Sequence, residues 1–177
     1  MEVGTIKVTV LVETINAVFQ MEEFLWELKN HIVGLNAGRW DYLFSYQKVH
    51  RNNKKFLLPD RSKVNMFVPF MTNYNKLLVD TCHKRGAFGM GGMSAQVIAK
   101  SNPPEFNKKA LDAVKKDKTR ELNQGNDGAW VAHPSLVGPV KDIFEKNFGG
   151  DNQLEKFNNN EFTKENLLSP PNIENNI

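Results

Sequence analysis

Cysteine is almost absent from this sequence. The 177 residues include one cysteine, Cys82, so an intrachain disulfide is excluded and a reducing compartment is indicated. Long apolar runs are absent too, since no stretch approaches the roughly 20 residues of a membrane-spanning helix. Residues 1–4 lack the basic and apolar pattern of a signal peptide. These absences argue against a disulfide-stapled fold and against a membrane partner.

A large excess of charge of one sign is absent as well. Lysine and arginine together number 23 against 20 aspartates and glutamates, which gives a net charge of +3. No basic stripe interleaved with aromatic residues appears, and this argues against a nucleic-acid partner. With 40% hydrophobic residues the composition is typical of a soluble globular domain. The length suffices for one such domain, but not for a closed barrel of eight strand–helix units, which needs about 250 residues.

What is present is a strand–helix–strand order near the N-terminus. Residues 5–13 are rich in β-branched side chains, place apolar residues at every second position and end in Glu13, a pattern that predicts a strand in a parallel sheet. A helix-length amphipathic segment, 15–30, separates it from a short second strand at 31–37. Strands joined in this way are parallel, so Glu13 and Asp41 should both lie at the carboxyl edge of the sheet. Two such carboxylates can hold one Mg²⁺ while water and substrate oxygens complete its coordination.

The surroundings of Asp41 leave two interpretations open. Trp40 and Tyr42 flank the carboxylate, and the glycine-rich bend 34–38 precedes it. A carboxylate in that position must be paired, hydrogen-bonded or bound to a metal. Alternatively it caps the following helix, and the residue types alone favour this second interpretation. Residues 42–48 fit either a helix or a bent extended segment.

The rest of the chain repeats the strand–helix order. Two more strands are predicted at 86–90 and 128–132, with Gly91 and Gly92 as the turn after the third, and further helices at 73–84, 105–122 and 136–148. From residue 151 the sequence is rich in asparagine and acids and carries Pro170-Pro171. Such a segment reads as a disordered or loosely packed tail, in which Leu167 and Leu168 dock locally.

One run of sequence is much more specific. Residues 29–44 read K-N-H-x-x-G-L-N-x-G-x-W-D-Y-L-F, and this run resembles the signature of malate synthase. Further stretches that agree are 12–14, 58–61, 82–88, 90–93 and 127–134, so the resemblance covers about residues 4 to 150. It is closest to the shorter, eukaryotic-type and bacterial A-type form. Malate synthases are much longer chains, so the resemblance implies the central part of a TIM barrel only.

The fold class predicted is therefore α/β: a partial (β/α)₈ TIM barrel of about four consecutive βα units. Residues 1–150 would form the partial barrel, and 151–177 would begin the linker to a further C-terminal domain. Two open sheet edges would permit self-association. Val8, Val10 and Phe88 would lie on the inner face and meet water in place of absent strands.

The resemblance also implies a chemistry, the condensation of acetyl-CoA with glyoxylate to malate and CoA in the glyoxylate cycle. In the family's pattern Glu13 and Asp41 ligate Mg²⁺. Backbone N–H groups of residues 38–41 bind glyoxylate, with Gly38 chosen for its missing Cβ and with Arg39 and Trp40 contributing main chain more than side chain. Trp130 and Pro134 line the acetyl-CoA site, although a core role for Trp130 is as well supported.

Two parts of the family's machinery have no counterpart in these residues: an arginine from an earlier strand and an aspartate base from the C-terminal domain. We therefore expect a fragment or truncated form, inactive by itself. Two alternatives stay open: an inactive truncated paralogue that binds Mg²⁺, CoA or a full-length partner, and a citrate-lyase-β-like lyase. The family occurs in peroxisomes or glyoxysomes and in the bacterial cytoplasm.

Two side-chain groups are interpreted as structural. The basic side chains on the helix 105–122 read as a solvated face and not as a phosphate site: Lys115, Lys116, Lys118 and Arg120. Cys82 has basic neighbours in the sequence, which can lower a thiol pKa. The stronger interpretation is a buried, inert thiol on the inner side of its helix.

Overall fold

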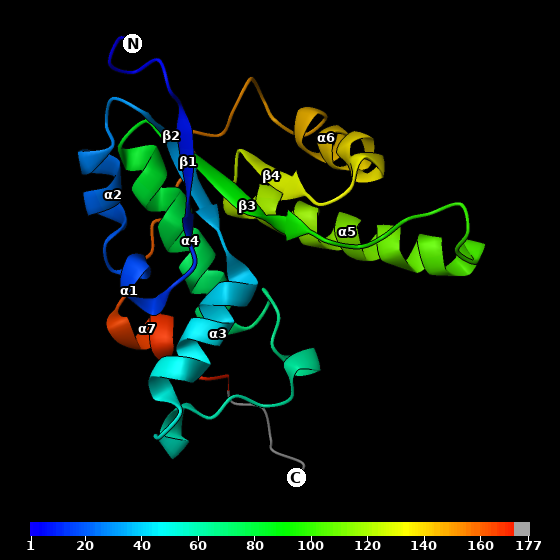
Figure 1. Ribbon diagram of the computed structural model, residues 1–177, viewed down its shortest axis with the longest axis horizontal. Coiled ribbons are helices and arrows are strands. Elements are labelled where there is room, and N and C mark those ends of the chain that lie inside the picture. Colours follow the sequence, from blue (N-terminus) through cyan, green and yellow to red (C-terminus); the bar gives the residue numbers. More distant parts are fainter. Residues whose placement is uncertain (172–177) are drawn as a thin grey trace.

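Four parallel strands form the centre of the computed structural model, which describes residues 1–171 (Figure 1). They are β1 (Val8–Val12), β2 (Ile32–Ala37), β3 (Phe88–Ser94) and β4 (Gly128–Val131), side by side in that order. Every neighbouring pair is parallel, as right-handed strand–helix–strand connections require. The prediction of four consecutive βα units is confirmed. β3 runs on to Ser94, so Gly91 and Gly92 belong to the strand, and their prediction as a turn is wrong.

Helices connect the strands. The α-helices are α1 (Ile15–Val18), α2 (Met21–Glu27), α3 (Arg39–His50), α4 (Pro69–Lys84), α5 (Pro104–Gln124), α6 (Val137–Glu145) and α7 (Lys164–Leu168). Short 3-10 helices occur at Lys54–Phe56, Arg61–Lys63 and Pro134–Leu136. The segment 15–30, predicted as one helix, is two: the chain leaves helical geometry at Phe19 and Gln20. Among the described helices, none combines the length and the apolar character that crossing a bilayer demands.

The main core lies between β1, β2 and the helices that cover them. Val12 and Leu35 are fully buried there together with Tyr74 and Leu78 of α4. Val10 packs against this cluster, and Val8 shares its face because strand residues alternate between faces. The prediction that Val8 and Val10 lie on the inner face is therefore wrong. Leu11, which alternates with them, lies on the inner face instead and is 38% exposed.

The inner-face prediction holds for the third strand. Cβ atoms built on Gly89 and Gly91 would meet Val79 of α4 and Glu121 of α5, so these glycines face the helices. Phe88, which alternates with them, faces the opposite side and is partly exposed.

The segment from 151 to 171 packs more closely than its composition indicates. Leu167 and Leu168 of α7 are 2% and 7% exposed. Their carbonyl oxygens accept hydrogen bonds from the hydroxyls of Tyr42 and Tyr46 on α3, at 3.3 and 2.7 Å. Local docking of the two leucines is thus confirmed. The end of the predicted tail, 172–177, lies outside the described residues.

Candidate functional site

The candidate site is the turn between β2 and α3, beside the end of β1. Val12 pairs with Ala37 in parallel register, and this places Glu13 next to Gly38. A Cβ on Gly38 would lie 2.5 Å from the Cβ of Glu13 and 3.1 Å from its Oε2. Distances under about 3 Å are not tolerated, so position 38 needs glycine to make room for Glu13. The need for glycine at position 38 thus has a cause inside the protein, and the role of Gly38 in binding glyoxylate stays a prediction.

Asp41 lies in the first turn of α3, whose N-cap is Gly38 and has no side-chain capping bond. The capping interpretation is therefore wrong, although an acid in the first turn suits the helix dipole. The Asp41 side chain is exposed and Glu13 is partly buried. The first N–H groups of a helix have no acceptor within the helix, so those of residues 39–41 point out at the carboxyl edge of the sheet. The undecided segment 42–48 is helical.

Two stacked tyrosines, Tyr42 and Tyr74, hold this turn in place. Tyr74 of α4 donates a hydrogen bond to the carbonyl of Val12, and its ring stacks on Tyr42 with centroids 4.3 Å apart and planes 3° from parallel. Burial, with a smaller contribution from Tyr42, raises the pKa of Tyr74 well above its usual value. Both hydroxyls stay neutral at physiological pH and can serve as donors. The end of β1 and the start of α3 are thereby tied to α4.

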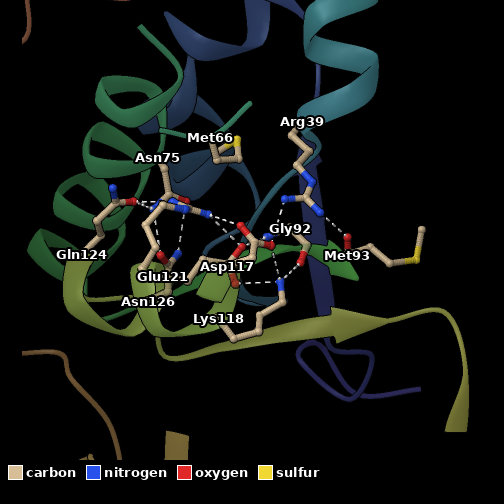
Figure 2. Close-up of polar contacts among 12 residues, drawn as sticks. Arg39, Met66, Asn75, Gly92, Met93, Asp117, Lys118, Glu121, Gln124 and Asn126 are labelled. Carbon is tan, nitrogen blue, oxygen red and sulfur yellow. Dashed lines mark hydrogen bonds and ion pairs between the residues drawn. The ribbon is translucent and has the colours of Figure 1, made fainter. Parts of the chain in front are cut away.

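The side chain of Arg39 reaches across the end of β3 to α5. Its Nη1 donates to Oδ2 of Asp117 on α5 at 2.8 Å, and its Nη2 donates to the carbonyl of Met93 at 3.0 Å (Figure 2). The two paired side chains are 14% and 13% exposed. The guanidinium is thus engaged by Asp117 and by Met93, and the main-chain role of Arg39 at the turn stays a prediction.

Sequence reasoning missed the buried charged cluster between β3 and α5 (Figure 2). Lys118 and Glu121 are fully buried and pair at 2.8 Å, and Glu121 also accepts from the N–H of Gly92 at 2.9 Å. Lys118 donates to the carbonyl of Gly92. Burial raises the pKa of Glu121 despite the nearby cations.

The prediction of a solvated basic face on α5 is half wrong. Lys115 and Lys116 are exposed, but Lys118 is 0% and Arg120 7% exposed. The reason is a trough in β3: a Cβ on Gly91 would lie 2.0 Å from Oε2 of Glu121. The adjacent glycines of β3 were the available signal, because a strand without side chains leaves room for a polar helix face.

The predicted acetyl-CoA residues also lie toward the carboxyl ends of the strands, but on and after β4, the last strand of the sheet. Trp130 is partly buried in β4, and Pro134, which is exposed, begins the 3-10 helix that follows. One strand, β3, lies between them and β2, which leads into the turn at Gly38. Cys82 is buried, and burial raises the pKa of its thiol to about 12. The acetyl-CoA roles of Trp130 and Pro134 stay predictions, whereas the predicted burial of Cys82 is confirmed.

The domain is a partial TIM barrel, with parallel strands covered by outer helices and with acids after the first two strands. Its candidate site lies at the carboxyl ends of the strands, where the active sites of TIM barrels are found. The fold agrees with a solved structure, a citrate lyase from Burkholderia xenovorans LB400, with a TM-score of 0.56 over 78% of this chain and 38% of that chain. At 16% identity this likeness shows the fold alone.

The chain belongs to the malate synthase family. The family described as malate synthase, TIM barrel domain, matches residues 1–170. The chain is 49% identical to malate synthase of Oryza sativa subsp. japonica over 175 residues, covering 95% of this chain. It is 50% identical to glyoxysomal malate synthase of Candida tropicalis and 49% identical to malate synthase A of Escherichia coli, over 94% of this chain in both cases. The chain spans only about a third of these relatives, 31 to 32% of their lengths.

Proposed function

We propose that these residues supply the metal and glyoxylate part of a malate synthase active site. The reaction is the condensation of acetyl-CoA with glyoxylate to malate and CoA in the glyoxylate cycle. The observation that supports this most directly is the placement of Glu13 against Gly38 at the start of α3. It brings a carboxylate to a helix N-terminus that has free N–H donors, the arrangement that a metal-bound anionic substrate needs.

Each residue of the turn has a separate task. Glu13 and Asp41 would hold Mg²⁺, which when bound polarises the substrate carbonyl and templates the substrate. The N–H groups of Arg39, Trp40 and Asp41 bind the glyoxylate carboxylate as a helix N-terminus binds anions. Gly38 allows Glu13 to reach the turn.

The donor set fits magnesium. Within residues 1–171 the His, Cys, Asp and Glu side chains do not gather in groups of three or more that suit a metal. The ion would therefore depend on two carboxylates and on oxygens of water and substrate. Mg²⁺ commonly keeps several waters and uses one or two carboxylates, so two acids are sufficient.

The acetyl-CoA side of the site would lie at the end of β4. Trp130 has an apolar ring that can pack against the thioester arm, and Pro134 borders the same edge. The family's pattern implies that its arginine and its aspartate base lie outside these residues. We therefore infer that the 177-residue chain alone does not form malate, because general-base assistance typically contributes 10²- to 10⁴-fold. Relatives named glyoxysomal support a peroxisome or glyoxysome as the compartment, and the cytoplasm is the alternative that the family resemblance implies.

The test is a calorimetric titration of the chain with Mg²⁺, followed by glyoxylate. Wild type should bind Mg²⁺ and then glyoxylate, and Asp41→Asn and Glu13→Gln should each weaken Mg²⁺ binding by about tenfold or more, because each removes a ligand charge. Asp112→Asn is the matched control, since Asp112 is an exposed acid on α5. Equal Mg²⁺ affinity in wild type and in both site variants would contradict the proposal.

A further inference from the structure

The start of α3 is connected to α5 by one side chain. Arg39 extends its guanidinium over β3, with its Cδ and Nε 3.4 and 3.5 Å from the position of a Cβ on Gly92. It reaches both the carbonyl of Met93 and the carboxylate of Asp117. One group thus spans the ends of two neighbouring βα units, those of β2 and β3 (Figure 2).

Asp117 is itself held in place. Oδ1 accepts from Nη2 of Arg120 at 3.1 Å, and Oδ2 lies 3.4 Å from Nζ of Lys118. Burial alone would raise the pKa of Asp117, but Lys118, Arg39 and Arg120 together outweigh it and hold that pKa below its usual value. The carboxylate is therefore charged, nearly buried and contacted by three cations.

The anchor continues deep into the domain. Nη1 of Arg120 donates to Oε1 of Gln124 at 2.6 Å. The same oxygen accepts from Asn75 of α4 at 2.7 Å, and Asn75 bonds to Asn126 ahead of β4 at 2.7 Å. Asp117 is the point at which this buried network meets the candidate site.

We propose that Asp117 is a positioning residue that, through Arg39, fixes the backbone N–H donors at the start of α3 for glyoxylate. The role rests on the proposed glyoxylate site. A carboxylate side chain such as that of Asp41 can turn about its own torsions to reach a metal. Backbone N–H groups cannot, so their geometry depends on what fixes the turn. Loss of Asp117 should therefore weaken glyoxylate binding far more than Mg²⁺ binding.

The experiment compares Asp117→Asn with Asp112→Asn on the full chain, titrated with Mg²⁺ alone and then with sodium glyoxylate at saturating Mg²⁺. For Asp117→Asn we expect a glyoxylate Kd raised by about tenfold or more, and a Mg²⁺ Kd within about threefold of wild type. Asp112→Asn should change neither constant. Unchanged glyoxylate affinity in Asp117→Asn overturns the proposal.

A double-mutant cycle separates positioning from a general loss of packing. If Asp117 acts through Arg39, the variant Arg39→Met/Asp117→Asn should bind glyoxylate about as weakly as either single variant. Additive losses overturn the proposal. Should Asp117→Asn fail to fold by circular dichroism, Arg39→Lys takes its place. A lysine ammonium lacks the fork that contacts Asp117 and Met93 together.

Selective ¹⁵N-tryptophan labelling reports on the turn without any ligand. The chain has three tryptophans, of which Trp40 carries one of the proposed donors while Trp26 and Trp130 lie elsewhere. The Trp40 amide signal should move or broaden in Asp117→Asn and stay in place in Asp112→Asn, with Trp26 as internal control. If wild type fails to bind glyoxylate, the proposed function fails. The Trp40 signal then decides separately whether Asp117 positions the turn, and an unmoved signal overturns that claim.

Discussion

Gly91→Ala is the sharpest perturbation that the structure offers. The added Cβ would lie 2.0 Å from Oε2 and 2.3 Å from Cδ of Glu121. The obstacle is a carboxylate that is itself fixed on both oxygens, by Lys118 and by the N–H of Gly92. The methyl group can be accommodated only if this carboxylate moves, and its movement leaves the buried Lys118 without its closest counter-charge.

The expected loss of stability follows from the unpaired buried charge of Lys118. Removing one partner of a buried ion pair destabilises a protein by about 3–5 kcal/mol, against a typical total stability of about 5–15 kcal/mol. With a urea dependence of about 2 kcal/mol per molar, the urea midpoint of Gly91→Ala should fall by about 2 M. Far-UV circular dichroism at one fixed protein concentration measures this.

Gly138→Ala is the matched control. Gly138 lies in α6 with nothing within 4 Å of an added Cβ, and alanine stabilises a helix by about 0.5–1 kcal/mol relative to glycine. Its midpoint should stay or rise slightly. A Gly91→Ala protein that unfolds at the wild-type midpoint would refute the view that the glycine exists to accommodate Glu121.

Three further outcomes are expected. His83 is buried and bonds to Asp127 at 2.9 Å; burial would lower its pKa, but the bond to Asp127 and the carbonyl of Lys156 raise it above 6.5. Stability from this pair is therefore complete below about pH 6.5 and lost as pH rises through the raised value, so urea midpoints should fall from pH 6 toward pH 9, and His83→Gln should flatten that fall. Cys82, with a thiol pKa raised to about 12 by burial, should react with Ellman's reagent only after unfolding; rapid reaction of the folded chain would contradict its burial. Sedimentation should give species heavier than the 20.2 kDa monomer, because β1 and β4 have open edges and Leu11 is exposed; Leu11→Lys should increase the monomer fraction, and a wild-type monomer at all concentrations would contradict this.

The fold was largely predictable because its signals are local. Alternating apolar residues in 5–13 and the short apolar run at 31–37 are sufficient to predict two strands, and the helix between them fixes their relative direction. Which face each residue takes is a finer question. Val8, Val10 and Val12 form one apolar row, and the sequence does not say whether helices or the barrel interior cover it. Only the packing of α4 decides that they face the helices.

The order of strands and helices made the position of the candidate site predictable. The side-chain contacts that hold the site in place were not predictable. Glu13 and Asp41 follow consecutive parallel strands, so their shared edge follows from connectivity. Arg39 and Asp117 are 78 positions apart, and no periodic pattern relates them. Their pairing depends on how far α5 extends beside the end of β3, a property of tertiary packing alone.

The buried charges of α5 show why composition misleads here. Residues 115–120 include four basic side chains, and this pattern predicts a solvent-exposed face on any helix that covers an ordinary apolar strand. β3 is not such a strand, since Gly91 presents no side chain to α5 and so leaves the backbone N–H and C=O of Gly92 within reach of that helix. Burying Lys118 and Glu121 then becomes tolerable because each finds the other and the polar backbone of Gly92. The glycines predicted as a turn thus make room for a layer of charged side chains. That layer holds Asp117, and through it Arg39, at the end of the sheet where glyoxylate is proposed to bind.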